Sequence, residues 1–431
     1  MQTILKRGLA TACALLLALA LPTSSSAYAV LSHEAIIDSA WDTGIKPVLL
    51  KRFPNATADE LRQAHGYAYG GAIIQDMGYY PHGSLFFSDL AHYVRSGDFI
   101  VAMIRDSKDL NDYAFALGAL AHYAADMDGH RIGTNPAVPI LYPKLKKKFG
   151  NSATYEDDPL AHVKTEFGFD VLEVAQQRYA PDSYHDFIGF QVAGALLEQA
   201  FQETYGLELK SVLADENLVL NSYRHDVSTL LPKATRIAWS LKKNEIQKDA
   251  PGTTKKKFLY NMSRASYEKQ WGGEYQKPTF NEKFLAFLYK LLPKIGPLRV
   301  LQFRTPTPET EKMFEASFNA TMDRYRKLLA ETGEGHLELP NDNFDTGEPT
   351  GPGKYRMNDD AHAELLDRLA EKQFAGASPE MRAELLQFFS DPQTQYVTKA
   401  KPKIWAKVQA NVELLKTAPA ATQVEAQTGS H

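Results

Sequence analysis

The stretch "DYAFALGALAHYAADMDGH", from Asp112 to His130, combines a run of small and apolar residues with three side chains that can bind a metal. His122, Asp126 and His130 are spaced slightly more than one helical turn apart, so they fall along one stripe of a helix. Their alanine and leucine neighbours are typical of a helix that packs in an interior. Burying two imidazoles and a carboxylate without partners costs about 1–3 kcal/mol for each unsatisfied group. A divalent metal offsets that cost, because His and Asp are zinc ligands, and local hydrogen bonds are the alternative.

The amino-terminal residues and the composition are those of an exported globular protein. Lys6 and Arg7 precede an apolar run over residues 9–21, and small residues follow, which predicts a secretory signal peptide at 1–27. The chain has 431 residues, 44% of them hydrophobic, and a net charge of −4, so nothing draws it as a whole to nucleic acid or anionic lipid. The single cysteine, Cys13, lies in the predicted signal, so the mature chain is expected to fold without disulfides. No later segment is apolar enough to span a membrane, and we expect an exported protein, periplasmic or secreted.

Further histidines and acids extend the candidate site. Asp76 ends the stretch "YGGAIIQD", and His92 lies in "FFSDLAHYVRSGDF". His162 and Glu166 share one face of a predicted helix in "AHVKTEFGFDVLE", and His33 stands near the processed terminus in "LSHEAI". Each residue alone is a weak signal, because a lone histidine on an apolar helix is more often a core residue. Together they supply enough ligands for two or three metal ions, with positions left for water.

Three other histidines bear on this assignment. His82 in "YYPHGSL" is an alternative to His92 as a ligand, although His92 has the better sequence distance from Asp76. His65 and His185 are assigned to structural roles.

Three stretches in this order, "LSHEAI", "DYAFALGALAHYAADMDGH" and "HVKTEFGF", resemble the zinc-dependent phospholipase C family. That family includes bacterial phospholipases C and the catalytic part of glycosylphosphatidylinositol phospholipase D, and its site is similar in design to that of single-strand-specific nucleases. The resemblance covers roughly Tyr28 to Ala200. It implies an all-α, multi-helix domain with a tri-zinc cleft, to which the rest of the chain adds a helical C-terminal extension.

The resemblance also implies the ligands of the three zinc ions. The first ion would be held by Asp76, His92, His122 and Asp126, the second by Asp126, His33 and the α-amine and carbonyl of the mature amino terminus, and the third by His130, His162 and Glu166. Signal cleavage after Ala27 makes Tyr28 the terminus, and cleavage after Ala29 makes it Val30. The spacing between the terminus and its histidine in the phospholipase D and nuclease types favours Tyr28 as the terminal ligand.

Zinc ions at such a site activate a water molecule and stabilise charge on a phosphoryl group. Asp76 is the candidate catalytic residue, because a carboxylate beside the metal can orient the attacking water and accept its proton. The expected activity is hydrolysis of a phospholipid or another phosphodiester. A stable nucleic-acid partner is not expected, since the basic run "YPKLKKKFG" at 142–150 is the one feature that would suit phosphate contacts.

Two other functions stay open: a single-strand nuclease or nucleotidase with the same tri-zinc site, and a non-catalytic, zinc-stabilised binding module. Aromatic residues near Asp76 in the sequence could stack on a base or a choline group, but core packing is the commoner role for such residues. They are Tyr67, Tyr69, Tyr79, Tyr80, Phe86 and Phe87.

The composition also predicts how the chain is divided. We expect a catalytic domain at 28–210, a helical extension at 211–338, a linker at 339–360, short helical segments at 361–416 and a disordered tail at 417–431. The linker is predicted from the Gly, Pro, Asn and Asp residues of "LPNDNFDTGEPTGPGKYRMNDD". Residues 283–304 are apolar and cationic, and they predict either a peripheral membrane contact or a helix–turn–helix packed on the core.

Overall fold

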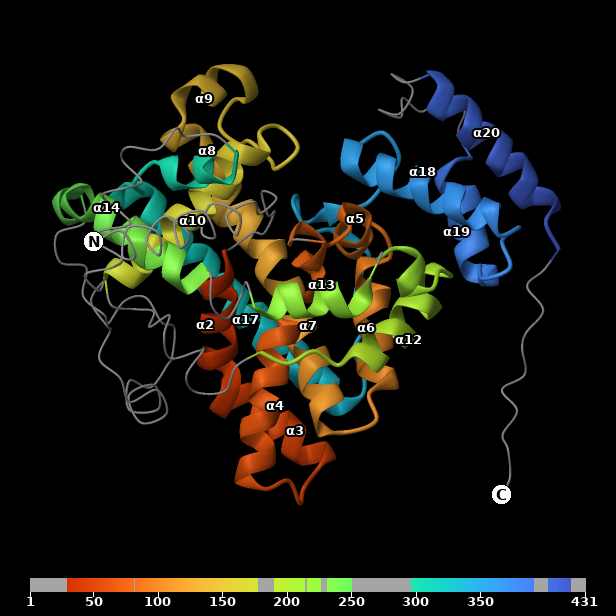
Figure 1. Cartoon of the computed structure of the whole chain (residues 1–431), viewed down its shortest axis with the longest axis horizontal. Helices are drawn as coiled ribbons and strands as arrows, with labels where there is room; N and C mark the ends of the chain where they lie inside the picture. The colour runs from red at the N-terminus through yellow and green to blue at the C-terminus, as the bar shows by residue number, and fades with distance from the viewer. Residues whose placement is uncertain are drawn as a thin grey trace, which may run out of the picture.

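The computed structural model describes residues 29–80, 82–176, 190–213, 215–225, 231–249, 296–390 and 402–419. Most of these residues are helical (Figure 1), which confirms the all-α class. The first part of the chain contains α2 (Val30–Ala40), the π-helix η1 (Trp41–Ile45), α3 (Lys46–Arg52), α4 (Ala58–Gly71), the 3-10 helix η2 (Ile74–Tyr79), α5 (Leu85–Tyr93), α6 (Ser96–Asp106), α7 (Leu110–Asp128), the π-helix η3 (Gly129–Thr134), α8 (Asn135–Leu141), α9 (Pro143–Phe149) and α10 (Pro159–Ala175). It continues with α12 (Gly194–Tyr205), η4 (Leu209–Ser211), α13 (Glu216–His225), α14 (Leu231–Asp249), η6 (Gly296–Gln302), α17 (Pro308–Glu334), β1 (Asp342–Asn343), β2 (Glu348–Pro349), α18 (Arg356–Glu371), α19 (Pro379–Phe388) and α20 (Pro402–Thr417).

Helix α7 is the centre of the fold and carries the stripe of ligand-type residues. It begins at an amino-terminal cap, where the Asp109 carboxylate accepts hydrogen bonds from the backbone amides of Asn111 and Asp112 at 2.9 Å each. Its small residues let α4 approach closely, since a Cβ on Gly118 would lie 2.2 Å from the carbonyl oxygen of Ala68. The two helices therefore meet at backbone contact, and the ligand-bearing half of α7 is buried.

Helix α17 packs along α7 and against η3. Its apolar stripe places Phe314, Phe318 and Met322 in the same core as α2 and α4. The Tyr325 hydroxyl donates a hydrogen bond to the carbonyl oxygen of Leu117 at 2.8 Å and ties the two helices together. The region expected as a helical extension thus supplies part of the core that surrounds α7.

Residues 339–360, expected to be a linker, instead fold over the ligand-bearing part of α7. Strands β1 and β2 pair antiparallel as a short hairpin, and Gly347 takes a φ of +67° in its turn. Phe344, between the strands, is fully buried, and its ring packs against α7. The composition misled because the Gly, Pro, Asn and Asp residues that mark linkers also form tight hairpin turns.

Helices α18, α19 and α20 form one side of the molecule, at the upper right of Figure 1. Helix α18 packs against α5, and α20 packs against α18 and α19. These helices confirm the expected helical C-terminal region. Residues 420–431 of the expected disordered tail lie outside the described residues.

Two other expected features fall wholly or mostly outside the described residues: the signal peptide at 1–27, and residues 283–295 of the apolar, cationic stretch at 283–304. The described end of that stretch, η6, leads into Phe303, whose ring lies 5.7 Å from that of Phe167 on α10. This end therefore lies on the core. In the part of the chain that the structure describes, no helix has the length and apolar character needed to cross a membrane.

Candidate metal centre

Eight side chains predicted as ligands converge on one buried cluster, and each is at most 2% exposed. They are His33 on α2, Asp76 in η2, His92 on α5, His122 and Asp126 on α7, His130 in η3, and His162 and Glu166 on α10. Their ligand atoms form three groups, within each of which the atoms lie no more than 4.8 Å apart. The first group is Asp76, His92 and His122, the second is His33, His122 and Asp126, and the third is His130, His162 and Glu166. The helical fold thus brings residues from six elements to a cluster of the size that metal ions require.

In the first group, two histidines face carboxylates with one ring nitrogen and a backbone carbonyl with the other. His92 Nε2 lies 3.3 Å from Asp76 Oδ1 and 3.4 Å from Asp126 Oδ2, and its Nδ1 is 2.7 Å from the carbonyl oxygen of Ser88. His122 Nε2 lies 3.2 Å from Asp126 Oδ2, and its Nδ1 is 2.9 Å from a carbonyl oxygen at the end of α4. The carbonyls accept the Nδ1 protons, so the Nε2 lone pairs face the carboxylates. Two acceptors in contact need a cation between them, which is a proton in the metal-free cluster and would be a metal ion in the metal-bound one.

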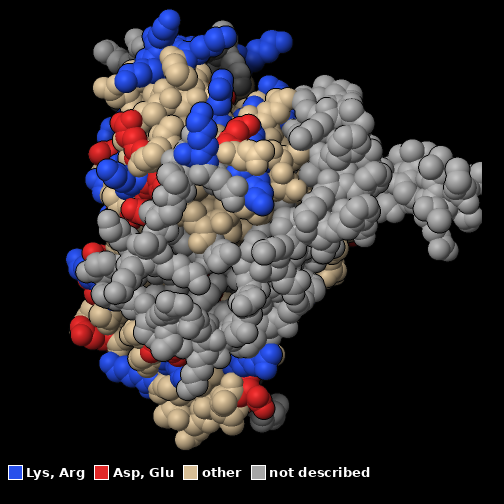
Figure 2. Space-filling view, turned by 90° about the vertical axis from the view of Figure 1, so that its left-hand side faces the viewer, with Lys and Arg blue, Asp and Glu red and all other residues tan. Residues whose placement is uncertain are grey.

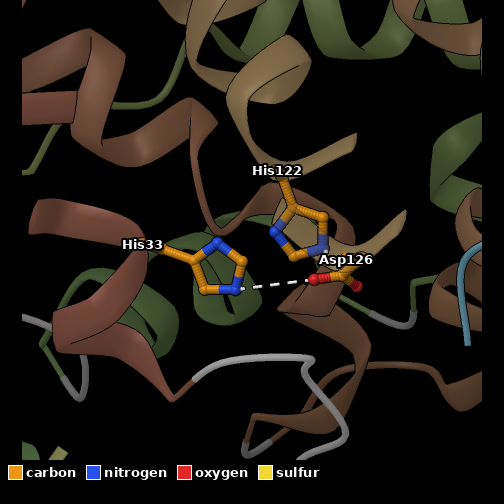
Figure 3. A group of neighbouring side chains, drawn as sticks. All are labelled: His33, His122 and Asp126. Carbon is orange, nitrogen blue, oxygen red and sulfur yellow. Dashed lines mark ion pairs between the residues drawn. The ribbon is translucent and has the colours of Figure 1, made fainter. Parts of the chain in front are cut away.

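Asp126 lies between the first and second groups. Its Oδ2 faces His92 and His122, and its Oδ1 lies 3.7 Å from His33 Nε2 (Figure 3). The rings of His33 and His122 stack, with centroids 4.5 Å apart and planes 9° apart. A carboxylate with one oxygen toward each group has the geometry of a bridging ligand, which is the role that the resemblance implies for Asp126.

The third group lies where α7 ends and the π-helix η3 begins. His162 Nδ1 is 2.8 Å from Glu166 Oε1, one turn along α10, and its Nε2 is 2.9 Å from the amide oxygen of Asn135. His130 stacks on His162 with ring centroids 4.9 Å apart, and its Nε2 faces Asp126 Oδ2 at 3.8 Å. The wider π turn takes His130 away from the straight stripe of α7 and toward α10.

Burial and mutual contact shift the pKa values of the cluster. Burial raises the pKa of the Glu166 carboxyl well above its usual range. Burial also raises the pKa of the Asp126 carboxyl, but His122 and the neighbouring histidines lower it by more. The pKa of this carboxyl is therefore held well below its usual range. For His92, burial lowers the pKa, but Asp126 and Asp76 reverse the effect, and the pKa rises to about 10. A dication would supply the positive charge that protons must supply in the metal-free cluster.

Zinc fits this set of side chains, because imidazole nitrogens and carboxylate oxygens are its ligands. The ligand-type atoms that lack a hydrogen-bond partner among the described residues include Asp76 Oδ1, His92 Nε2, His122 Nε2, both Asp126 carboxylate oxygens, His162 Nδ1 and Glu166 Oε1. Each such buried atom costs about 1–3 kcal/mol. Metal ions bound to these atoms would remove that penalty.

The structure distinguishes His92 from the alternative ligand. His82 is exposed, with a φ of +67°, whereas His92 is buried beside Asp76. His65 is buried away from the three groups and stacks on Trp41 with ring centroids 3.8 Å apart. Its contacts are those of the structural residue that was expected.

Tyr28, the predicted terminal ligand, precedes the first described residue by one position. His185 also lies outside the described residues. Helix α2 begins at Val30, two residues after Tyr28, and carries His33 in its first turn. The terminal ligand and the signal cleavage point therefore stay predictions.

Most of the aromatic residues near Asp76 belong to the core. Tyr69, Tyr79, Tyr80, Phe86 and Phe87 are at most 5% exposed. The ring of Phe87, for example, stacks on Phe201 of α12 with centroids 5.5 Å apart. These side chains stabilise the elements that carry Asp76 and His92 and do not form an exposed surface for a base or a choline group.

The basic run at 142–150 forms α9 on the surface. Lys144, Lys146, Lys147 and Lys148 are all exposed, and Lys and Arg residues gather at the top of the face in Figure 2, the end at which α9 lies in Figure 1.

Asp170, which is not among the predicted site residues, holds the start of α2 beside α10. Its carboxylate accepts hydrogen bonds from the backbone amide of Leu31 at 2.9 Å and from the Ser32 hydroxyl at 2.7 Å, and so fixes the turn of α2 that carries His33. The sequence spacing could have identified Asp170, because this residue continues the four-residue spacing of His162 and Glu166 along α10.

Asp345 is likewise not among the predicted site residues. This residue follows Phe344 in the hairpin over α7, and its Oδ1 lies 3.1 Å from His130 Nδ1. Its surroundings in the sequence have the composition of a linker and no helical spacing, so only the tertiary structure reveals it.

The helical fold and its three buried groups define a candidate multi-zinc centre of the kind found in hydrolases. Comparison with protein families agrees with this class, since residues 32–215 match the family described as zinc dependent phospholipase C. The matched segment is similar to this family, whose description implies a zinc-dependent hydrolase that acts on the phosphodiester of a phospholipid. Comparisons with curated proteins and with solved structures give no match.

The matched segment contains all eight side chains of the cluster. It ends before α13, so α17 and the hairpin that carries Asp345 lie outside it.

Proposed function

We propose that this protein is an exported, zinc-dependent hydrolase of phospholipase C type that cleaves the phosphodiester of a phospholipid. The observation that carries the proposal is the cluster of three buried His/Asp/Glu groups within the family-matched segment. The predicted leader at 1–27 supports export to the periplasm or beyond the cell.

The proposed zinc sites use the residues that the resemblance implies. Asp76, His92, His122 and Asp126 would hold the first ion, Asp126, His33 and the terminal Tyr28 the second, and His130, His162 and Glu166 the third. Zinc ions bound there would supply a water of lowered pKa and positive charge beside the phosphoryl oxygens. The carbonyl partners of His92 and His122 hold both rings so that their Nε2 atoms point into the cluster.

Asp76 is the proposed catalytic residue. Its Oδ1 lies at the first group, 3.3 Å from His92 Nε2, and has no hydrogen-bond partner among the described residues. A carboxylate in this position can orient the attacking water and accept its proton.

The test uses the mature protein in its zinc-loaded form. We expect about three zinc ions per chain, and hydrolysis of phosphatidylcholine vesicles that a chelator abolishes and added zinc restores. Asp76→Asn should lower the rate by about 10²–10⁴-fold. The matched control is Asp59→Asn, which removes an exposed carboxylate in the first turn of α4 and should leave the rate unchanged.

The same preparation distinguishes the other functions. Faster cleavage of single-stranded DNA than of any phospholipid would indicate the nuclease. Three bound zinc ions without turnover of either substrate would indicate the binding module. One zinc ion or none after metal repletion would contradict the proposed mechanism altogether.

A peripheral membrane contact through residues 283–304 remains part of the proposal. It is supported by the apolar and cationic composition of this stretch. Vesicle sedimentation tests it: replacing Lys283 and Lys290 by Glu should weaken binding to anionic vesicles, and unchanged binding would contradict the contact.

A further inference from the structure

The segment from Asn341 to Pro349 is fastened across the metal cluster. The Asn341 side-chain oxygen accepts hydrogen bonds from the backbone amides of Gly97 and Asp98 at 2.9 and 3.0 Å. The Phe344 amide donates to a carbonyl oxygen of α5 at 3.2 Å. The segment is therefore a fixed part of the wall around the cluster.

Asp345 is the best-anchored residue of this segment. Its Oδ2 accepts hydrogen bonds from the Tyr155 amide at 2.9 Å and from the Tyr355 hydroxyl. Its own amide donates to the Asn343 side chain at 2.8 Å, and its carbonyl oxygen accepts from the Asn135 side chain at 2.7 Å. These contacts hold both the backbone and one carboxylate oxygen, and so they set the direction of the other oxygen.

That other oxygen, Oδ1, is directed at the third group. Asp345 is 2% exposed, and its Oδ1 lies 3.1 Å from His130 Nδ1 and 3.7 Å from His162 Nε2. His130 Nδ1 is also 3.3 Å from His162 Nε2. The Asn135 side-chain oxygen, at 2.9 Å, accepts the His162 Nε2 proton, and two N–H groups cannot bond to each other. Asp345 Oδ1, 3.1 Å away, makes no hydrogen bond within the part of the chain that the structure describes, so it is the acceptor available to the His130 Nδ1 proton once the ring turns toward it.

The described histidines of the first and third groups then follow one rule. His92 and His122 direct Nδ1 at backbone carbonyls, and His162 directs Nε2 at an amide oxygen. In each case the other ring nitrogen faces a carboxylate of the cluster. His130 fits the pattern only if Asp345 takes the Nδ1 proton, which leaves Nε2 facing Asp126.

We infer that Asp345 is a positioning residue for the third zinc site: it accepts the Nδ1 proton of His130 and so directs Nε2 of that ring at the metal. A carboxylate behind a ligating imidazole sets its tautomer and orientation and raises its basicity. The inference rests on the proposed zinc centre and extends it, because Asp345 lies outside the family-matched segment. The C-terminal half thus completes the metal centre.

The first experiment measures zinc retention by the full-length mature protein over a series of chelator concentrations. Asp345→Asn should release one of the three zinc ions at a chelator concentration about 10–100-fold lower than wild type, with the other two unchanged. The control, Glu348→Gln, removes an exposed carboxylate from the same segment and should behave as wild type. Release identical to the control overturns the inference, as does loss of all three ions together, which would indicate collapse of the fold.

A second experiment separates positioning from direct ligation. The mature chain has no cysteine if the predicted signal is removed, so Asp345→Cys provides a unique thiol. Because thiolates bind Co²⁺ directly, a thiolate-to-cobalt charge-transfer band in the Co²⁺-loaded variant would make this position a ligand and overturn the positioning role. We expect no such band.

A third measurement follows the imidazole N–H itself. In the zinc-loaded protein a downfield ¹H resonance that Asp345→Asn shifts or removes, and that Glu348→Gln leaves in place, supports the Nδ1 contact. Its persistence unchanged in Asp345→Asn overturns it. Three bound zinc ions without hydrolysis of any phosphodiester would refute the proposed function alone, and an unaltered third zinc affinity in an active Asp345→Asn enzyme would refute this inference alone.

Discussion

Asp126 is the residue around which the cluster is organised. It is completely buried, and its two oxygens face histidines of different groups. An ionised carboxylate at such a depth is tolerable only with positive charge on both sides. Its neighbours provide that charge as protons or, in the proposed holoprotein, as metal ions.

Asp126→Asn tests this arrangement. We expect zinc to be lost from the first and second positions and kept at the third, because an amide offers one oxygen where the bridge needs two. Elemental analysis should show about one zinc ion per chain in place of about three. Asp323→Asn, which changes a carboxylate that is 61% exposed on α17, should keep the wild-type content. Full zinc content in Asp126→Asn would contradict the bridging role.

His362, on α18, makes stability depend on pH far from the cluster. Its ring is buried and stacks on Phe388 at 3.7 Å, and burial lowers the pKa from 6.5 to about 4. The unfolded chain therefore binds the extra proton between these values, and stability falls as the pH drops through that window. At pH 5 the loss relative to pH 7 is about 2 kcal/mol.

His362→Phe should remove this part of the pH dependence. The phenyl ring keeps the stacking and cannot be protonated, so the variant should lose about 2 kcal/mol less than wild type between pH 7 and pH 5. Urea unfolding of the metal-free protein at both pH values measures the difference. His336→Gln, at an exposed position, should match wild type. Equal pH dependence in His362→Phe and wild type would refute the prediction.

At the scale of elements, the crossing of α4 and α7 sets the position of the ligand stripe. A Cβ on Gly71 would lie 2.0 Å from the carbonyl oxygen of Phe115, and one on Gly118 would lie 2.2 Å from that of Ala68. Backbone atoms cannot move aside as a flexible side chain can. The glycines therefore permit the distance at which α7 presents His122 to the cluster.

Gly118→Ala should destabilise the protein by about 1–3 kcal/mol or more, because the added methyl group forces α4 and α7 apart. Gly333→Ala, near the end of α17, is the matched control, since its Cβ would make an ordinary contact at 3.6 Å with Val48. That variant should gain about 0.4–1 kcal/mol from the lower chain entropy of alanine. Chemical denaturation measures the change in the free energy of unfolding, which should fall for Gly118→Ala and rise for Gly333→Ala. An unchanged free energy of unfolding in Gly118→Ala would show that α4 and α7 can shift to accommodate the methyl group.

At the scale of the whole molecule, the family-matched segment does not form a separate core. The main apolar core runs from Val30 on α2 to Leu415 on α20, and α17 contributes side chains that contact α7. Residues 341–349 contribute Phe344, which packs against the histidines of the first group. Its ring centroid lies 5.2 Å from that of His92. The two halves of the chain therefore stabilise the same site.

A chain limited to residues 28–210 should consequently fail to fold cooperatively. Without α17 and the hairpin, it exposes the buried face of α7 and leaves a large cavity around the cluster. Near-ultraviolet circular dichroism should show lost tertiary packing, and dye binding should show exposed apolar surface. A chain of residues 28–419 keeps all of the described residues from α2 to α20 and should unfold cooperatively. A folded 28–210 chain with three zinc ions would contradict this reading.

The features that depend on neighbours one helical turn apart could be predicted from the sequence. The helical class, the stripe of His122 and Asp126, and the His162–Glu166 pair follow from spacing, because residues four apart on a helix share a face. The order of the motifs was enough to indicate the family. Asp170 could have been added on the same grounds.

Contacts between residues far apart in the sequence could be read only from the folded chain. It placed His92 rather than His82 beside Asp76, put α17 in the core, and brought Asp345 from an apparent linker to His130. Periodicity carries no information about such contacts, since a hairpin and a linker use the same turn-forming residues and differ only in what they pack against. The side chains that depend on local spacing are therefore readable from the sequence, whereas those that depend on long-range packing are not.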